Sequence, residues 1–135
     1  MNNEFFANYV KFVNSVTSEQ SRQYTGFEKS LYTMKTEHLV PPERLLTATL
    51  GLSAEAGEFG DLVKKCIFQG KELNEENKLH MKKELGDIMW YMAQACLALG
   101  VTLDDVIKTN IEKLEKRYPN GFEKIRSENK ARFDV

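Results

Sequence analysis

Hydrophobic residues recur at three- and four-residue steps over most of the chain, and this period is typical of amphipathic helices. Residues 4–18 form the first such segment, with apolar side chains at Phe6, Tyr9, Val10, Val13 and Val16. The stretch 19–40 is less regular, and Thr25-Gly26 indicates a turn there, followed by another short helix. The beginning of the chain therefore predicts a helix over 4–18 and a weaker helical pattern over 19–40.

Two long helices are predicted in the middle of the chain. Pro41-Pro42 marks the start of the first, because proline suits the first helical turn, and the helical pattern continues to Gly70. Asn74 is the expected N-cap of the second, which ends at Gly100 with a left-handed stop. The connection between the two helices is short, so we expect them to be antiparallel neighbours.

A further helix follows the central pair. The segment 102–105 reads Thr-Leu-Asp-Asp, a capping box with aspartate in place of the usual glutamate. The apolar stripe of this helix consists of Leu103, Ile107, Ile111, Leu114 and Tyr118. Pro119-Asn120-Gly121 ends it, and a charged tail occupies 123–135. With no convincing strand, the sequence predicts a single all-α domain over 1–135, with a four-helix-bundle-like core and an extra N-terminal helix.

Charge and composition exclude several classes of partner. The 19 basic and 20 acidic residues leave a formal net charge of −1, which is unlike a protein that binds duplex nucleic acid. No apolar run approaches the roughly 18 residues of a membrane span. The first residues lack the pattern of a signal peptide, so Cys66 and Cys96 are expected to be reduced thiols. We therefore expect a cytoplasmic protein that binds neither nucleic acid nor membrane.

Two pairs of acids carry the candidate chemistry. Glu55 and Glu58 lie on the first long helix, and Glu84 and Asp87 lie on the second, each pair at i,i+3 spacing on one side of its helix. If the two helices are antiparallel neighbours, the four carboxylates converge. Their mutual repulsion is then relieved by a hard divalent cation, and Mg²⁺, with Mn²⁺ as an alternative, prefers such oxygen ligands.

Two alternatives use the same residues. The acids pair with lysines at the helix edges in the first alternative, and the candidates are Lys64, Lys65, Lys82 and Lys83. A di-iron carboxylate bundle is the second, and it requires Glu-x-x-His motifs. Neither His38 nor His80 lies three residues after a glutamate, which argues against iron.

The blocks "GLSAEAGEFGDLVKK", "KKELGDIMWYMA" and "NIEKLEKRYPNGF" resemble the MazG-like family of all-α nucleoside triphosphate pyrophosphohydrolases, over about residues 41–122. The family signature, E-x-x-E followed by E-x-x-D, corresponds to Glu55, Glu58, Glu84 and Asp87. The resemblance implies Mg²⁺-dependent cleavage of a nucleoside triphosphate to a monophosphate and pyrophosphate, in nucleotide-pool cleansing. It further implies that the four acids hold the metal, with Glu55 or Glu58 acting as the general base.

The third block contains candidate substrate contacts. Asn110, Lys113 and Arg117 are spaced i, i+3 and i+7 on one helix face, and a triphosphate requires such cations opposite its oxygens. A solvated helix face is the alternative, but the resemblance implies that this helix supplies phosphate-binding side chains. Trp90, on an apolar stripe, is assigned to packing. The residues expected near the base belong to the irregular early region: Tyr24, Phe27, Tyr32 and His38.

The sequence alone does not decide between several related functions, nor does it fix the oligomeric state. A dUTPase-like or dCTPase-like activity, a phosphoribosyl-ATP pyrophosphohydrolase and a non-catalytic helical nucleotide-binding module are the alternatives. "KLEKRYPNGF" argues against the phosphoribosyl-ATP enzyme, and the presence of all four signature acids argues against a loss of turnover. Apolar side chains exceed what one thin helical unit can bury, so we expect a homodimer or homotetramer.

Overall fold

The computed structural model describes residues 3–129, and helices dominate this part of the chain. Their bounds are α1 (Asn3–Val16), α2 (Glu19–Arg22), α3 (Tyr24–Thr36), α4 (Pro42–Phe68), α5 (Glu75–Leu99), α6 (Leu103–Arg117) and α7 (Lys124–Glu128). The all-α fold class with an extra N-terminal helix is confirmed. The chain divides into two compact units, 1–42 and 43–135, and the single domain stays a prediction.

In the first unit, the predicted turn at Thr25-Gly26 is wrong, because both residues belong to the first turn of α3. The break lies at Gln23, whose extended backbone (φ −128°, ψ 128°) ends α2 and precedes α3. Gly26 has a packing role: a Cβ there would lie 3.3 Å from the Cγ of Glu19. Glycine thus lets α3 approach α2 closely instead of reversing the chain.

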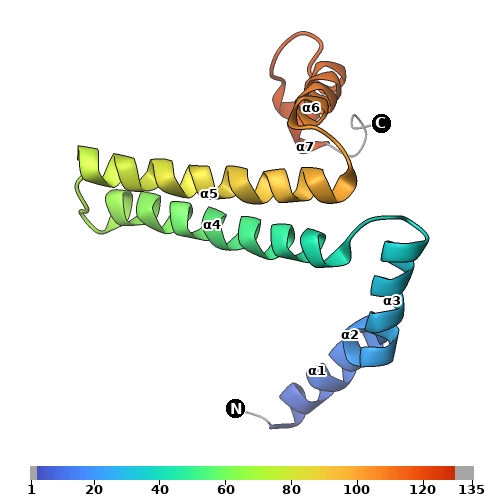
Figure 1. The fold of residues 1–135 in the computed structure, drawn as a ribbon. Coiled ribbons are helices and arrows are strands. Elements are labelled where there is room, and N and C mark those ends of the chain that lie inside the picture. The colour runs from blue at the N-terminus through green and yellow to red at the C-terminus, as the bar shows by residue number, and fades with distance from the viewer. Residues whose placement is uncertain (1–2, 130–135) are drawn as a thin grey trace. The chain divides into compact units, whose positions relative to one another are not determined.

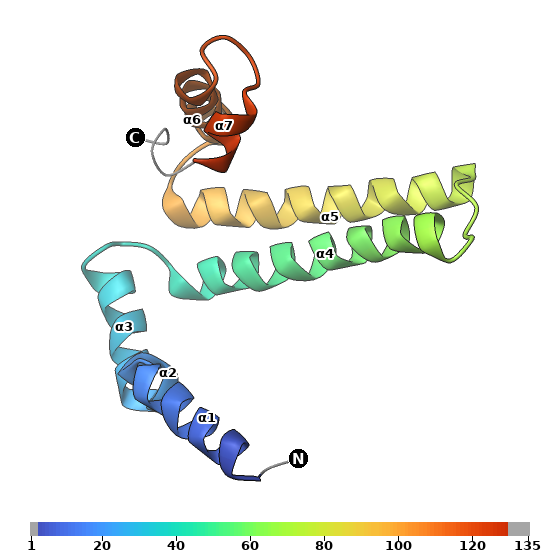
Figure 2. The same ribbon diagram turned by 180° about the vertical axis from the view of Figure 1, so that it is seen from behind.

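In the second unit, α4 and α5 form the predicted antiparallel pair and lie side by side in both views (Figures 1 and 2). The predicted caps of α5 are confirmed. The Asn74 side chain accepts a hydrogen bond from the backbone N–H of Asn77 at 3.0 Å. Gly100 adopts the left-handed conformation (φ 67°) at the other end. Both signals act through local backbone chemistry, so the sequence could reveal them.

The contact between α4 and α5 depends on Gly51. A Cβ at this position would lie 2.1 Å from Cε1 of the Tyr91 ring, far inside van der Waals contact. The tyrosine ring therefore occupies the space that any other side chain at position 51 would need. This close approach explains a glycine inside a long helix, where it costs roughly 1 kcal/mol relative to alanine.

The predicted capping box opens α6. The Thr102 hydroxyl accepts a hydrogen bond from the backbone N–H of Asp105 (3.1 Å), and the Asp105 carboxylate accepts one from the Thr102 N–H (3.0 Å). The Thr102 hydroxyl also donates a hydrogen bond to the Asp105 carboxylate (2.6 Å), and this bond, followed by the one from the Thr102 N–H, lowers the pKa of Asp105. The helix ends before Pro119, as expected. Part of the predicted tail forms α7, while 130–135 lie outside the described residues.

Few apolar side chains are buried within the described part of one copy of the chain, and most of them are small. The buried apolar residues of the described part are Ala48, Leu62, Cys96 and Ala98. Larger ones on α5 stay about half exposed: Leu85 at 48%, Met89 at 49% and Trp90 at 54%. Trp90, which the sequence assigns to packing, packs edge-on against the Tyr91 ring, with the ring centroids 4.8 Å apart, and keeps about half of its surface exposed.

Both cysteines are free thiols, as predicted: Cys96 is buried and Cys66 is partly buried. Among the described helices, none has the length and apolar character needed to cross a membrane.

Candidate active site

Three glutamates from two helices meet at the α4–α5 contact. Glu55 and Glu58 come from α4, and Glu84 comes from α5. Each offers a carboxylate oxygen, and these oxygens lie within 4.8 Å of one another. Glu84 is only 6% exposed, which is unusual for an acid. The antiparallel packing thus brings Glu84, one member of the second sequence pair, to both members of the first.

A cleft of about 350 Å³ adjoins this cluster, lined by Ala54, Gly57, Glu58, Asp61, Leu62, Lys65, His80 and Glu84. Small residues leave it open on the α4 side. A Cβ at Gly57 would have no neighbouring atom within 4 Å. Gly51 and Gly57 therefore serve different purposes, since the first admits a packed aromatic ring and the second borders empty space.

The electrostatics of the cluster favour a cation. Partial burial of Glu55 raises its pKa, and the negative charges of Glu58 and Asp87 and a side-chain hydrogen bond with Glu84 raise it further. An acid whose anionic form is disfavoured by neighbouring acids gains from any added positive charge. A hard divalent ion with oxygen ligands and retained waters fits this donor set.

Asp87, the fourth predicted ligand, stands apart from the three glutamates. It is exposed and lies one turn beyond Glu84 on α5. It does not belong to the group whose oxygens come within 4.8 Å. Its charge nevertheless acts on Glu55, as the raised pKa shows. The structure therefore places Asp87 beside the cluster.

The sequence left open whether lysines pair with the acids of the cluster, and the structure answers this for the two lysines of α4. Lys64 and Lys65 both form ion pairs with Asp61. Hydrogen bonds from these two lysines lower the pKa of Asp61 to about 2. In the described part of the chain, these ammonium groups thus neutralise Asp61 and do not form ion pairs with Glu55 or Glu58.

His80 is the residue of this site that sequence reasoning missed. Its Nε2 lies 3.0 Å from Oε1 of Glu84, and both residues line the cleft. The Glu-x-x-His pattern does not include it, because here the histidine precedes the acid by four residues. The i,i+4 spacing places the two side chains on one face of α5 and was the available signal.

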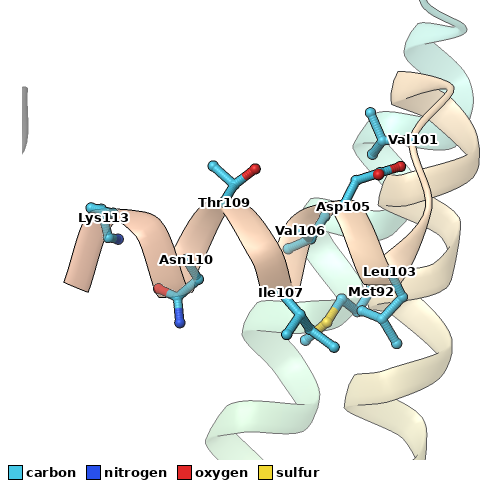
Figure 3. Close-up of a pocket in the computed structure, with 9 residues that line it drawn as sticks. All are labelled: Met92, Val101, Leu103, Asp105, Val106, Ile107, Thr109, Asn110 and Lys113. Carbon is cyan, nitrogen blue, oxygen red and sulfur yellow. The ribbon is translucent and has the colours of Figure 1, made fainter. Parts of the chain in front are cut away.

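The predicted substrate contacts on α6 separate into two groups. Asn110 and Lys113 line a second pocket, of about 500 Å³, together with apolar residues (Figure 3). Met92 of α5 lies beside Leu103 at one end of this pocket, and Lys113 lies further along α6 (Figure 3).

Arg117 lies at the end of α6 and does not line that pocket. It is 8% exposed, with its guanidinium carbon 5.8 Å from the centre of the Tyr118 ring. Its backbone carbonyl accepts a hydrogen bond from Nη1 of Arg126 at 3.3 Å. Arg117 is thus built into the junction between α6 and α7.

Comparison with known proteins decides the family. The MazG nucleotide pyrophosphohydrolase domain matches residues 43–122, which is more than half of the chain. The chain belongs to the MazG family. It is therefore a nucleotide pyrophosphohydrolase, a hydrolase that acts on phosphoric anhydride bonds of nucleotides. The MazG family is generally dependent on divalent metal ions, in agreement with the carboxylate cluster.

The MazG match contains all four signature acids and the three candidate contacts of α6, whereas the first unit lies outside it. The chain is also similar to "Gene 37 protein" of Mycobacterium phage L5, with 42% identity over 81 residues. That alignment covers 58% of this chain and 70% of the phage protein. No solved structure matches the chain significantly.

Proposed function

We propose that the chain is a Mg²⁺-dependent pyrophosphohydrolase that cleaves nucleoside or deoxynucleoside triphosphates to monophosphates and pyrophosphate. The observation that supports this proposal is the cluster of three carboxylate oxygens within 4.8 Å, one of them from the buried Glu84. The cluster borders an open cleft within the region matched by the MazG family. Nucleotide-pool cleansing in the cytoplasm is the proposed role.

Glu55, Glu58, Glu84 and Asp87 are the proposed metal-binding residues, with Mn²⁺ as a substitute for Mg²⁺. When bound, the cation supplies charge neutralisation at the phosphate oxygens. Glu55 or Glu58 accepts a proton from the water that attacks the α-phosphorus. The bond from the α-phosphorus to the bridging oxygen then breaks, and pyrophosphate leaves with the electron pair.

Asn110, Lys113 and Arg117 are the proposed substrate-binding residues. Lys113 is exposed and lines the α6 pocket with Asn110, which supports direct contact with phosphate oxygens. Arg117 is largely buried, so its proposed contact requires the end of α6 to border the bound nucleotide.

A homodimer or homotetramer is the proposed assembly. Half-exposed apolar side chains on α5 and α6 support it, including Leu85, Met89, Ile107 and Ile111. Contiguous exposed apolar surface on a globular protein usually marks an interface.

The experiment is an assay of the full chain with Mg²⁺ and a panel of nucleotides that includes dUTP and dCTP, with both products identified. Glu84→Gln should lower kcat at least about 100-fold, because metal charge stabilisation is worth several kcal/mol and each 1.36 kcal/mol is tenfold in rate. Glu72→Gln, which removes an exposed acid from the loop before α5, is the matched control and should retain activity. No turnover of any nucleotide by the folded wild-type protein would contradict the proposal.

A third variant separates binding from chemistry in the same assay. Lys113→Ala should raise KM about tenfold or more with little change in kcat, because it removes a charge-assisted contact made in ground state and transition state alike. Unchanged KM in this variant would remove Lys113 from the substrate site without affecting the assignment of the carboxylates.

A further inference from the structure

His80 holds one oxygen of the most buried acid in the cluster. Its Nε2 lies 3.0 Å from Oε1 of Glu84. The Glu84 side chain is 8% exposed, whereas that of His80 is 51% exposed. The imidazole therefore reaches from the surface of the cleft to a carboxylate in its floor.

This contact differs from an ordinary surface pair on a helix. Exposed i,i+4 pairs contribute a few tenths of a kcal/mol and restrict their partners little. Glu84 is buried, and it also shares a side-chain hydrogen bond with Glu55 of α4. Its carboxylate is thus held from two sides, by its own helix and by the neighbouring one.

The lysine that lines the cleft, Lys65, and its neighbour Lys64 have a different partner. Lys64 and Lys65 pair with Asp61, one turn along α4 from Glu58. Within the described residues, His80 is consequently the basic side chain that pairs with Glu84. The cleft thus separates two functions, since ammonium groups neutralise Asp61 and an imidazole contacts Glu84.

The chemistry of imidazole suits a contact next to a metal-binding acid. Lysine carries a compact full charge that would compete with a divalent cation for the carboxylate. An imidazole Nε2–H donates a hydrogen bond without requiring a fixed positive charge. Groups that hydrogen-bond to a ligating carboxylate orient it, and their removal typically weakens metal affinity 10–100-fold.

We propose that His80 is a positioning residue, which fixes the Glu84 carboxylate in the orientation that brings its oxygen within 4.8 Å of the Glu55 and Glu58 oxygens. This inference rests on the proposed function, because it takes the three glutamates as the metal-binding set. It adds a residue outside the four signature acids and gives the cleft a preformed geometry.

The test is Mn²⁺ binding to the full chain without nucleotide, measured by electron paramagnetic resonance of free Mn²⁺. His80→Ala should raise the dissociation constant about 10–100-fold. His80→Gln should restore it to near the wild-type value, because the glutamine amide can donate from about the place of Nε2. Lys83→Ala is the matched control, since it removes a full charge from an exposed position one turn along α5 and should leave binding unchanged.

Circular dichroism verifies that each variant is folded, and His80→Asn, whose amide is shorter, replaces the alanine variant if that one does not fold. A dissociation constant for His80→Ala within twofold of wild type would overturn the inference and leave the proposed function intact. Equal weakening by alanine and glutamine would overturn it too, because the hydrogen bond would then not be the cause. A wild-type protein that binds no Mn²⁺ would overturn both proposals.

Discussion

At the scale of one residue, Glu55 shows how neighbouring acids disfavour the ionised form of a carboxyl group. Partial burial comes first among the causes that raise its pKa, followed by the charges of Glu58 and Asp87 and the contact with Glu84. In the metal-free protein, a proton on Glu55 reduces the repulsion among these carboxylates. The same electrostatics that favour a cation therefore make the empty cluster a source of instability.

This leads to a prediction about pH. Well below the ordinary pKa of 4.5, Glu55 is protonated in both the folded and the unfolded chain and does not affect the stability. As the pH rises above that value, the unfolded chain releases the proton first, because the folded pKa is raised. The folded state therefore loses stability over this interval, and the loss persists at higher pH. Glu55→Gln should be more stable than wild type at pH 7 in a chelator, and the difference should vanish near pH 3.5.

Urea unfolding at the two pH values measures the effect, with Glu72→Gln as the control for removing an exposed acid. Equal stability of Glu55→Gln and wild type at pH 7 would show that the neighbouring acids do not disfavour the Glu55 anion.

At the scale of elements, the α4–α5 pair explains why one helix tolerates several glycines. Gly51 is buried against the Tyr91 ring, whereas Gly60 is exposed with no atom within 4 Å of a Cβ placed there. The two glycines have the same intrinsic cost in a helix but opposite packing consequences.

Gly51→Ala should therefore destabilise the protein by about 1–3 kcal/mol, because the added methyl group overpacks the contact with Tyr91. Gly60→Ala is the matched control and should stabilise by about 0.5–1 kcal/mol, since alanine is the better helix former. Urea unfolding measures both changes. A stabilising effect of Gly51→Ala would mean that the helices are not packed closely at this point.

The caps of these helices were predictable from sequence, because each depends on a few neighbouring residues. Asn74, Gly100 and the Thr102–Asp105 box all have the expected geometry. The turn predicted at Thr25-Gly26 is wrong because the glycine there serves a contact between two helices. Gly26 allows α3 to approach α2 closely, and no local sequence pattern reveals such a contact.

At the scale of the whole molecule, apolar surface is the dominant feature. Leu97, Leu99, Ile107 and Ile111 are all between 47% and 62% exposed, although they follow helical stripes that normally face a core. The buried apolar side chains of the described residues are few and small. A second copy is the proposed cover for this surface.

Light scattering at micromolar concentration should accordingly give a mass of two copies of the 15.6 kDa chain or a multiple of that number. The expectation follows from the free energy of burying these stripes, about 25 cal/mol per Å² of apolar surface. A mass of 15.6 kDa would contradict a homo-oligomer.

The sequence by itself determined the helices, most of their ends and the identity of the four acids, because helical period, caps and i,i+3 spacing act over a few residues. Only the tertiary structure decided which groups meet. It joined Glu84 to Glu55 and Glu58, left Asp87 beside them and paired Lys64 and Lys65 with Asp61. Side-chain partners across two helices depend on packing distance and relative rotation, and neither is set by spacing along one helix.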